Sequence, residues 1–297
     1  MRILFVTATR LGDAVLSTGL LDHLLRTHPG ARFTVACGPV TAGIFDRMPR
    51  LDRLILVRKR RFDLHWPALW RQVAGTRWDL VVDLRASVLG WMLRARRRAV
   101  ARGGRRPGAR VEHLGEVLGL RPAPLPVAWT APADEARAAE VLPAGPWLVL
   151  GPTANWAPKV WPAARFVEAA RVLTAPGGPL AGARIAVVAG PGSVERAMAA
   201  PVLEGLPGAV DLVGRLSLPE IAAAFRRATL YMGNDSGLMH LAAAAGAPTL
   251  GLFGPTSAEE YGPAGPRARA VVAPRPEMEA LHLAPVLDAA AGLLGRP

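Results

Sequence analysis

The sequence is poor in cysteine and has no long run of uncharged apolar residues. Its one cysteine, Cys37, excludes an internal disulfide framework and a zinc site built from cysteines. The plainest interpretation of Cys37 is a small buried side chain near a strand end. The apolar run within residues 1–6 is too short for a signal peptide, and glycines and prolines interrupt the uncharged stretch 241–258. We therefore expect a cytoplasmic protein.

Several motifs of common enzyme classes are also missing. The sequence has no P-loop, no Gly-x-Gly-x-x-Gly after its first predicted strand and no Gly-x-Ser-x-Gly elbow. Its His, Asp and Glu residues do not show the spacing of metal ligands, and the paired carboxylates of glycoside hydrolases are not evident. The sequence thus predicts no metal site and no bound cofactor.

Lysine is scarce, and the positive charge is uneven. Of 36 Lys and Arg residues only Lys59 and Lys159 are lysines, and the formal net charge is +13. Residues 1–145 hold 24 basic and 12 acidic residues, whereas residues 146–297 hold 12 and 11. The first half should therefore meet an anionic partner such as nucleic acid, a membrane surface or an acidic substrate, unless the charge only confers solubility.

The hydrophobic pattern alternates between short buried strands and amphipathic helices. A cluster of helix breakers at 143–146 separates two such arrays. The pattern predicts an α/β protein with two Rossmann-like parallel-sheet domains facing a cleft, at 1–143 and 144–297, with the last helix a candidate to pack back on the first domain. Strands are expected at 2–7, 32–36, 54–57, 78–84, 147–150, 184–189, 210–213, 228–232 and 249–253, and helices at 15–27, 88–98, 134–142, 163–173, 194–203, 218–227 and 278–294.

The stretch 233–246 combines a strand end, a polar turn and an Ala-rich helix. Asp235 or Ser236 can cap this helix, and Gly237 allows a ligand to approach the backbone. His240 lies one turn inside and would face the same opening, although a structural histidine is the alternative. Because a helix N-terminus favours anions, the stretch predicts a phosphate or diphosphate site.

Three further loops follow predicted strands, where ligands bind in open α/β sheets. Asp13 in the first loop is either a helix cap or a general base. Lys159 lies in a loop with Thr153 and Asn155 and is either a surface lysine or a group that neutralises a phosphate. The Gly-rich turn 190–193 is weak evidence by itself.

Together these loops resemble glycosyltransferase family 9, the ADP-heptose:lipopolysaccharide heptosyltransferases. The resemblance covers nearly the whole chain. It implies a GT-B fold and an inverting, metal-independent transfer, with the donor bound by the second domain and the acceptor by the first. The segments that carry it are Arg10-Leu11-Gly12-Asp13, residues 79–84, Lys159-Val160-Trp161-Pro162, residues 213–218, residues 233–242 and Leu252-Phe253-Gly254-Pro255-Thr256.

The resemblance also implies residue roles. Asp13 matches the general base that deprotonates the acceptor hydroxyl, and Lys159 matches the lysine that stabilises the departing diphosphate. Residues 235–237 and 240 match the motif that binds the ADP-sugar co-substrate. The donor-binding residues implied are Thr153, Asn155 (where the family often has Ser or Thr), Glu195 for the ribose, Asp235, Ser236, Gly237, Met239 for the base and His240.

The basic first half gains a role from this resemblance, because a phosphorylated lipopolysaccharide core is anionic. We expect acceptor binding by Arg10, Arg58, Lys59, Arg60 and Arg61. The arginines at 94–110 are candidates for peripheral contact with the anionic inner membrane. Two alternatives are a GT-B relative such as a nucleotide-sugar epimerase and a basic nucleic-acid-binding protein.

Overall fold

The computed structural model describes residues 1–59, 61–104 and 106–295, which form two compact units, Met1–Trp129 and Thr130–Pro297. The division falls at 129/130, earlier than the 143/144 expected from the breaker cluster. Helix α7 (Pro132–Val141) explains this difference, because it packs on α10 (Leu218–Arg226) of the second unit. Arg226 donates to Thr130 and to Glu135, which fixes the start of the second unit.

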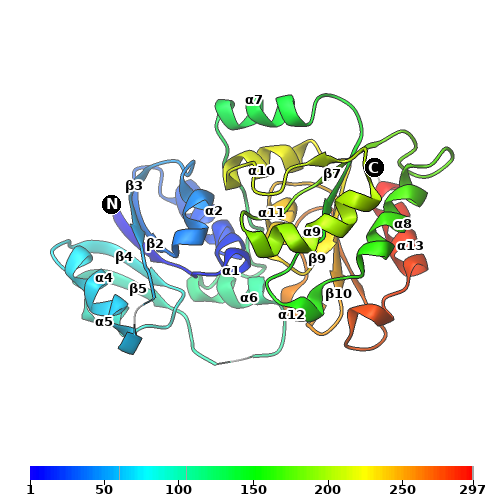
Figure 1. Ribbon diagram of the computed structural model, residues 1–297. Coiled ribbons are helices and arrows are strands. Elements are labelled where there is room, and N and C mark those ends of the chain that lie inside the picture. The colour runs from blue at the N-terminus through cyan, green and yellow to red at the C-terminus, as the bar shows by residue number, and fades with distance from the viewer. Residues whose placement is uncertain (60, 105, 296–297) are drawn as a thin grey trace. The chain divides into compact units, whose positions relative to one another are not determined.

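The first unit is built on a five-stranded parallel sheet with the order β3-β2-β1-β4-β5 (Figure 1). Its strands are β1 (Arg2–Val6), β2 (Arg32–Cys37), β3 (Leu51–Leu56), β4 (Trp78–Asp83) and β5 (Ala95–Val100). Its α-helices are α1 (Leu11–Leu16), α2 (Thr18–Thr27), α3 (Ala42–Phe45), α4 (His65–Val73), α5 (Leu89–Met92) and α6 (Arg110–Gly115), and its 3-10 turns are η1 (Pro39–Thr41), η2 (Arg61–Asp63) and η3 (Glu116–Leu118).

Two predictions for the first unit are wrong in detail. The helix expected at 88–98 is only the short α5, and its arginine-rich second half is strand β5, which pairs with β4. The helix expected at 15–27 is divided at Ser17, whose hydroxyl donates to the carbonyl oxygen of Ala14. Helix α1 also begins earlier than expected, at Leu11 with Arg10 as the N-cap, so Asp13 lies inside its first turn.

The second unit has a six-stranded parallel sheet with the order β11-β10-β9-β6-β7-β8. Its strands are β6 (Trp147–Gly151), β7 (Arg184–Val187), β8 (Val210–Asp211), β9 (Leu230–Asn234), β10 (Thr249–Phe253) and β11 (Ala268–Val272). Its remaining α-helices are α8 (Ala163–Thr174), α9 (Ser193–Gly205), α11 (Gly237–Ala244), α12 (Ala258–Tyr261) and α13 (Leu283–Leu294), and its 3-10 turns are η4 (Ala157–Lys159) and η5 (Met278–Ala280).

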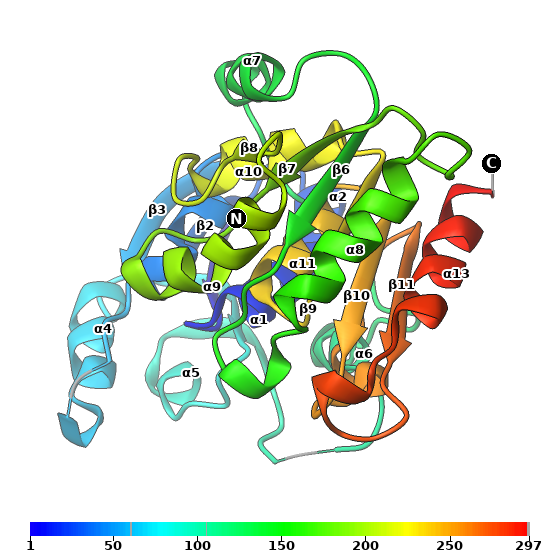
Figure 2. The same ribbon diagram turned by 45° about the vertical axis from the view of Figure 1, so that its right-hand side comes forward.

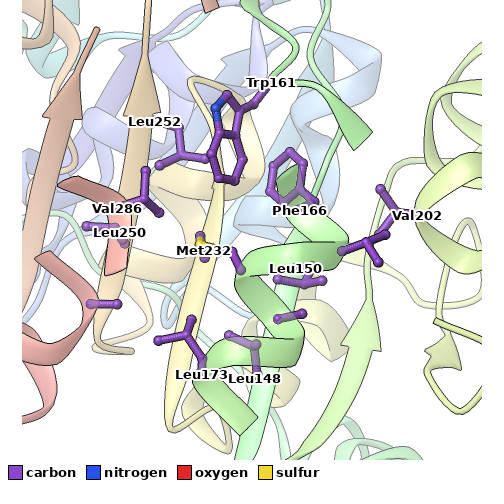
Figure 3. Packing of buried hydrophobic residues seen from close by; sticks show 14 of the residues in the cluster. Leu148, Leu150, Trp161, Phe166, Leu173, Val202, Met232, Leu250, Leu252 and Val286 are labelled. Carbon is purple, nitrogen blue, oxygen red and sulfur yellow. The ribbon is translucent and has the colours of Figure 1, made fainter. Parts of the chain in front are cut away.

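The core of the second unit lies between this sheet and helices α8, α9 and α13, which Figure 2 shows on one face. Apolar side chains of β6, β9 and β10 meet Trp161 and Phe166 in Figure 3, where the two rings pack edge to face with centroids 5.1 Å apart. Helix α13 packs on α8 and β11 of its own unit. The first unit has a comparable cluster under α4 and α5.

Cys37 is buried at the end of β2, and its burial raises the pKa of the thiol to about 11. This agrees with a packing role. None of the helices among the described residues has both the length and the apolar character needed to cross a bilayer.

Candidate active site

The register of the first sheet brings three loops to one edge. Val6 of β1 pairs with Asp83 of β4, and Asp83 pairs with Val100 of β5. Because the strands are parallel, the residues that follow these three positions all leave the sheet at its carboxyl edge. The loops after β1, β4 and β5 therefore converge, although they are far apart in the sequence.

These loops and α6 enclose a cavity of about 250 Å³. The Nε atom of Arg110 lies 3.4 Å from Oδ1 of Asp13, and both side chains are partly exposed. The cavity thus combines one carboxylate with three guanidinium groups, an arrangement suited to a substrate that carries both an anionic group and a hydroxyl. Its lining includes Thr7, Asp13, Arg85, Arg102, Arg110 and Leu114.

A buried carboxylate shapes one wall of this cavity. Asp83 has no exposed surface and accepts hydrogen bonds from the backbone N–H groups of Arg85 (2.8 Å) and Ser87 (3.1 Å) and from the Ser87 hydroxyl. Between them, Ala86 adopts a left-handed φ of 52°. Burial raises the pKa of Asp83 above its ordinary value. Asp83 therefore holds the loop that carries Arg85 to the cavity.

The basic residues predicted for the acceptor lie elsewhere on this unit. Arg58 and Lys59 follow β3, two strands away from β1 in the sheet order, and Arg61 lies in η2; all three are exposed. Arg10 is exposed at the start of α1, and Arg60 lies outside the described residues. None of these four described residues lines the cavity.

Sequence reasoning instead missed Arg85, Arg102 and Arg110 as cavity residues. The available signal was the position of Arg85 and Arg102 just after two parallel strands. The second of those strands, β5, was predicted as part of a helix, so the signal was lost for Arg102.

The second sheet repeats this arrangement. Gly151 of β6 pairs with Gly233 of β9, and Leu252 of β10 pairs with Asn234. The loops after β6, β9 and β10 consequently leave the sheet at one carboxyl edge. The predicted donor residues from 153 to 159 and from 235 to 240 lie on two of these loops and on helix α11.

An ion pair joins these loops. The Nζ atom of Lys159 lies 2.6 Å from Oδ2 of Asp235, and the Thr256 hydroxyl donates to the same oxygen at 2.8 Å. The Lys159 side chain is 18% exposed and that of Asp235 only 6%. A single carboxylate thus fixes the ammonium group that the sequence assigned to the departing diphosphate.

The segment after Lys159 is anchored to the core. Trp161 is fully buried, its backbone N–H donates to Oδ1 of Asn234 at 3.0 Å, and its indole N–H donates to the carbonyl oxygen of Leu281 at 2.8 Å. Among the described residues, the buried Nδ2 of Asn234 has no hydrogen-bond partner. Asn234 therefore links the strand before Asp235 to the loop of Lys159.

Helix α11 begins as the sequence predicted. Ser236 is its N-cap, and its hydroxyl accepts from the backbone N–H of Met239 at 3.4 Å. Gly237 is the first helical residue, so its N–H is among those that a helix leaves unpaired at its start. His240 is buried in the same helix. This helix end retains the amide donors expected at an anion site.

The other predicted donor residues differ in accessibility. Thr153 is mostly buried, whereas Asn155 is exposed. Glu195 lies in the first turn of α9 with its carboxylate over Gly192, whose φ of 134° suits a glycine. Met239 is fully buried, and a Cβ added to Gly251 would lie 2.4 Å from its sulfur, so Met239 offers no exposed surface to a base.

In the chain segments that the structure describes, no group of three or more His, Cys, Asp or Glu side chains could hold a metal ion. The cations of both sites are arginine and lysine side chains.

Comparison with known proteins covers nearly the whole chain. Lipopolysaccharide heptosyltransferase 1 of Pseudomonas aeruginosa is 28% identical in an alignment 295 residues long, which covers 86% of this chain and 79% of that protein. The crystal structure of a family 9 glycosyl transferase from Veillonella parvula matches with a TM-score of 0.81 and 22% identity over 99% of this chain and 97% of its own. E. coli ADP-heptose lipopolysaccharide heptosyltransferase II matches with a TM-score of 0.79 and 19% identity, covering 99% and 98%.

These likenesses confirm the α/β class and the GT-B architecture with two parallel-sheet domains. The sequence model of glycosyltransferase family 9 (heptosyltransferase) matches residues 113–289, which are more than half of the chain. The chain therefore belongs to glycosyltransferase family 9, the heptosyltransferase family, and is a glycosyltransferase.

Proposed function

We propose that the protein transfers a heptose from ADP-heptose to a hydroxyl of the lipopolysaccharide inner core, by a single displacement that inverts the anomeric centre and uses no metal. Family membership supports a heptosyl transfer. The names of the similar proteins from P. aeruginosa and E. coli support a lipopolysaccharide acceptor, and that of the E. coli enzyme supports ADP-heptose as donor.

The observation that carries this proposal is the position of Asp13 on the wall of an arginine-lined cavity. Phosphate and carboxylate groups of the acceptor bind to Arg85, Arg102 and Arg110 through charge-assisted hydrogen bonds. This holds an acceptor hydroxyl at Asp13, whose carboxylate takes the proton as the oxygen attacks the anomeric carbon.

The bond from the anomeric carbon to the diphosphate oxygen breaks in the same step, and its electron pair leaves with ADP. Lys159 and the first amides of α11 stabilise the negative charge that grows on the diphosphate. Asp235 holds Lys159 in the absence of the donor and binds sugar hydroxyls in its presence. Thr153, Asn155, Glu195 and His240 remain proposed donor residues.

The proposed acceptor is a glycolipid, so we place the reaction at the cytoplasmic face of the inner membrane, which the protein contacts peripherally. The basic first unit supports this location, because residues 1–129 hold 23 basic and 9 acidic residues. The epimerase and nucleic-acid alternatives do not fit a member of this glycosyltransferase family.

The test is an assay of heptose transfer from ADP-heptose to a deacylated inner-core acceptor. The ADP that is released and the mass of the product are measured. Asp13→Asn keeps the shape of the side chain and should lower turnover about 100- to 10,000-fold, while the affinity for ADP stays unchanged. Asp22→Asn, which changes an acid on α2 that pairs with Arg26, is the matched control. Unchanged turnover in Asp13→Asn would overturn the role of Asp13.

Two further measurements test the finer claims. The anomeric configuration of the product, determined by NMR, should be opposite to that of the donor. Turnover should be the same before and after dialysis against a chelator, whereas activity that returns only with added metal would contradict a metal-independent transfer.

A further inference from the structure

The first unit exposes large apolar side chains in two segments that follow the carboxyl ends of strands. After β3, Phe62 is 89% exposed, and Leu64 is also exposed. After β4, Val88, Trp91 and Met92 are exposed, on and beside α5. Burial of such side chains is the main driving force of folding, so an exposed group of them marks a surface that meets something apolar.

These two segments belong to one region of the unit. Helix α4, which follows Leu64, and helix α5 both pack on the same core cluster through Leu69, Val73, Leu89 and Leu93. Helices α4 and α5 are drawn in cyan on the first unit in Figures 1 and 2. We call Phe62, Leu64, Val88, Trp91 and Met92 the apolar tips.

The charge around the apolar tips is mostly positive. Residues 84–111 contain no acidic residue and nine arginines, of which Arg85, Arg102 and Arg110 line the cavity and six remain. Arg58, Lys59 and Arg61 are exposed next to Phe62, with Asp63 as the acid in that segment. Aromatic and aliphatic side chains flanked by arginines are the composition of surfaces that insert into the boundary of an anionic bilayer.

We propose that the apolar tips insert into an anionic phospholipid bilayer, with the flanking arginines on the lipid phosphates. The aliphatic members favour lipid over nucleic acid, because Leu64, Val88 and Met92 have no planar face on which a base could stack. The absence of acidic residues from 84–111 favours an anionic bilayer over a second copy of the same basic unit. The apolar tips are separate from the arginines that line the cavity. The proposal that they bind lipid rests on the proposed function only for its biological purpose.

The test uses the full chain and flotation with vesicles of phosphatidylglycerol and phosphatidylcholine, compared with vesicles of phosphatidylcholine alone. The protein should bind the anionic vesicles and only weakly the neutral ones. The double variant Phe62→Ser with Trp91→Ser should lower the partition to anionic vesicles about tenfold or more, since each aromatic ring contributes apolar contact with the bilayer. The control is Val172→Ser with Val194→Ser, which removes exposed apolar side chains of the second unit and should bind like the original protein.

Three results would overturn the proposal. The first is that the Phe62/Trp91 variant binds vesicles as well as the original protein does. The second is that single-stranded RNA displaces the protein from the vesicles, and the third is that the original protein self-associates on size-exclusion chromatography and the variant does not. Because the two residues are exposed, thermal unfolding should be unaffected and serves as the check on folding. Transfer to a deacylated acceptor should be unchanged in this variant, so failure of the transfer reaction itself is distinguished from failure of docking.

Discussion

The ammonium group of Lys159 and the carboxylate of Asp235 lie 2.6 Å apart, and each side chain is less than one fifth exposed. Asp235 was assigned to donor binding and Lys159 to the departing diphosphate, yet in this structure the two groups bind each other. The pair therefore positions the site in addition to any role in transfer.

Removal of the lysine should reveal this second role. Lys159→Ala removes the ammonium group from the nearly buried carboxylate of Asp235, which still accepts a hydrogen bond from the Thr256 hydroxyl. We expect a loss of about 1–3 kcal/mol in the free energy of unfolding, below the range of about 3–5 kcal/mol for fully buried pairs, measured by urea denaturation. Adding Asp235→Asn to Lys159→Ala should cost less than the sum of the two single changes. Strict additivity would show that the pair contributes no coupling energy.

Kinetics can distinguish the arginines that line the cavity from the basic segment 58–61 as the acceptor site. Arg102→Gln should raise the KM for the acceptor about tenfold, which corresponds to about 1.4 kcal/mol for one lost charge-assisted contact, and should leave the affinity for ADP unchanged. Arg58→Gln, which lies outside the cavity, should change the KM for a deacylated acceptor by less than twofold. The reverse ranking would favour the segment 58–61 as the acceptor site.

The close packing at the end of β6 predicts that Gly151 does not tolerate an added side chain. A Cβ on Gly151 would lie 2.0 Å from the hydroxyl oxygen of Tyr231, which is fully buried. Gly151→Ala should therefore lower the free energy of unfolding by about 2 kcal/mol or more. Gly75→Ala is the control, since nothing lies within 4 Å of its added carbon. In the Gly151→Ala background, Tyr231→Phe should restore part of the loss, and no restoration would place the strain elsewhere.

Asp83 predicts a pH dependence of stability. Burial raises its folded-state pKa, so the folded protein keeps this proton more tightly than the unfolded chain does. Its contribution to stability is present below the ordinary pKa of 3.8 and is lost as the pH rises through the folded-state pKa. Each unit of difference between the two pKa values is worth about 1.4 kcal/mol.

The measurement is urea denaturation between about pH 4 and pH 7, with Asp83→Asn as the comparison. The free energy of unfolding of the original protein, minus that of the variant, should fall as the pH rises. A difference that rises with pH would mean that hydrogen bonds to the carboxylate outweigh its burial.

Local patterns in the sequence were sufficient for much of the second unit. Strand β10 lies at 249–253 as predicted, and the capped helix after Asn234 begins at Gly237. Here the hydrophobic runs are continuous because both faces of the sheet are covered, and the turn residues define the ends. The same features made Asp235 and Ser236 recognisable as members of one loop.

The first unit shows what the sequence could not provide. Strand β5 has the sequence Ala-Arg-Arg-Arg-Ala-Val, lies at the edge of its sheet and is largely exposed, so it lacks the alternating pattern of a strand. This segment forms a strand because it pairs with β4. The same pairing brings Arg102 to the cavity. The early unit boundary likewise depends on the contact of α7 with α10, which links distant parts of the chain.

The order of strands in the second sheet also bears on how the protein is made. Strand β6 is synthesised before β9, its neighbour on one side, and the whole of β7, β8 and their helices lies between them in the chain. A nascent chain that has not yet reached β9 presents one edge of β6 without its partner, together with the apolar residues that later become buried. The second unit must therefore be synthesised as far as β9 before that edge of β6 is protected.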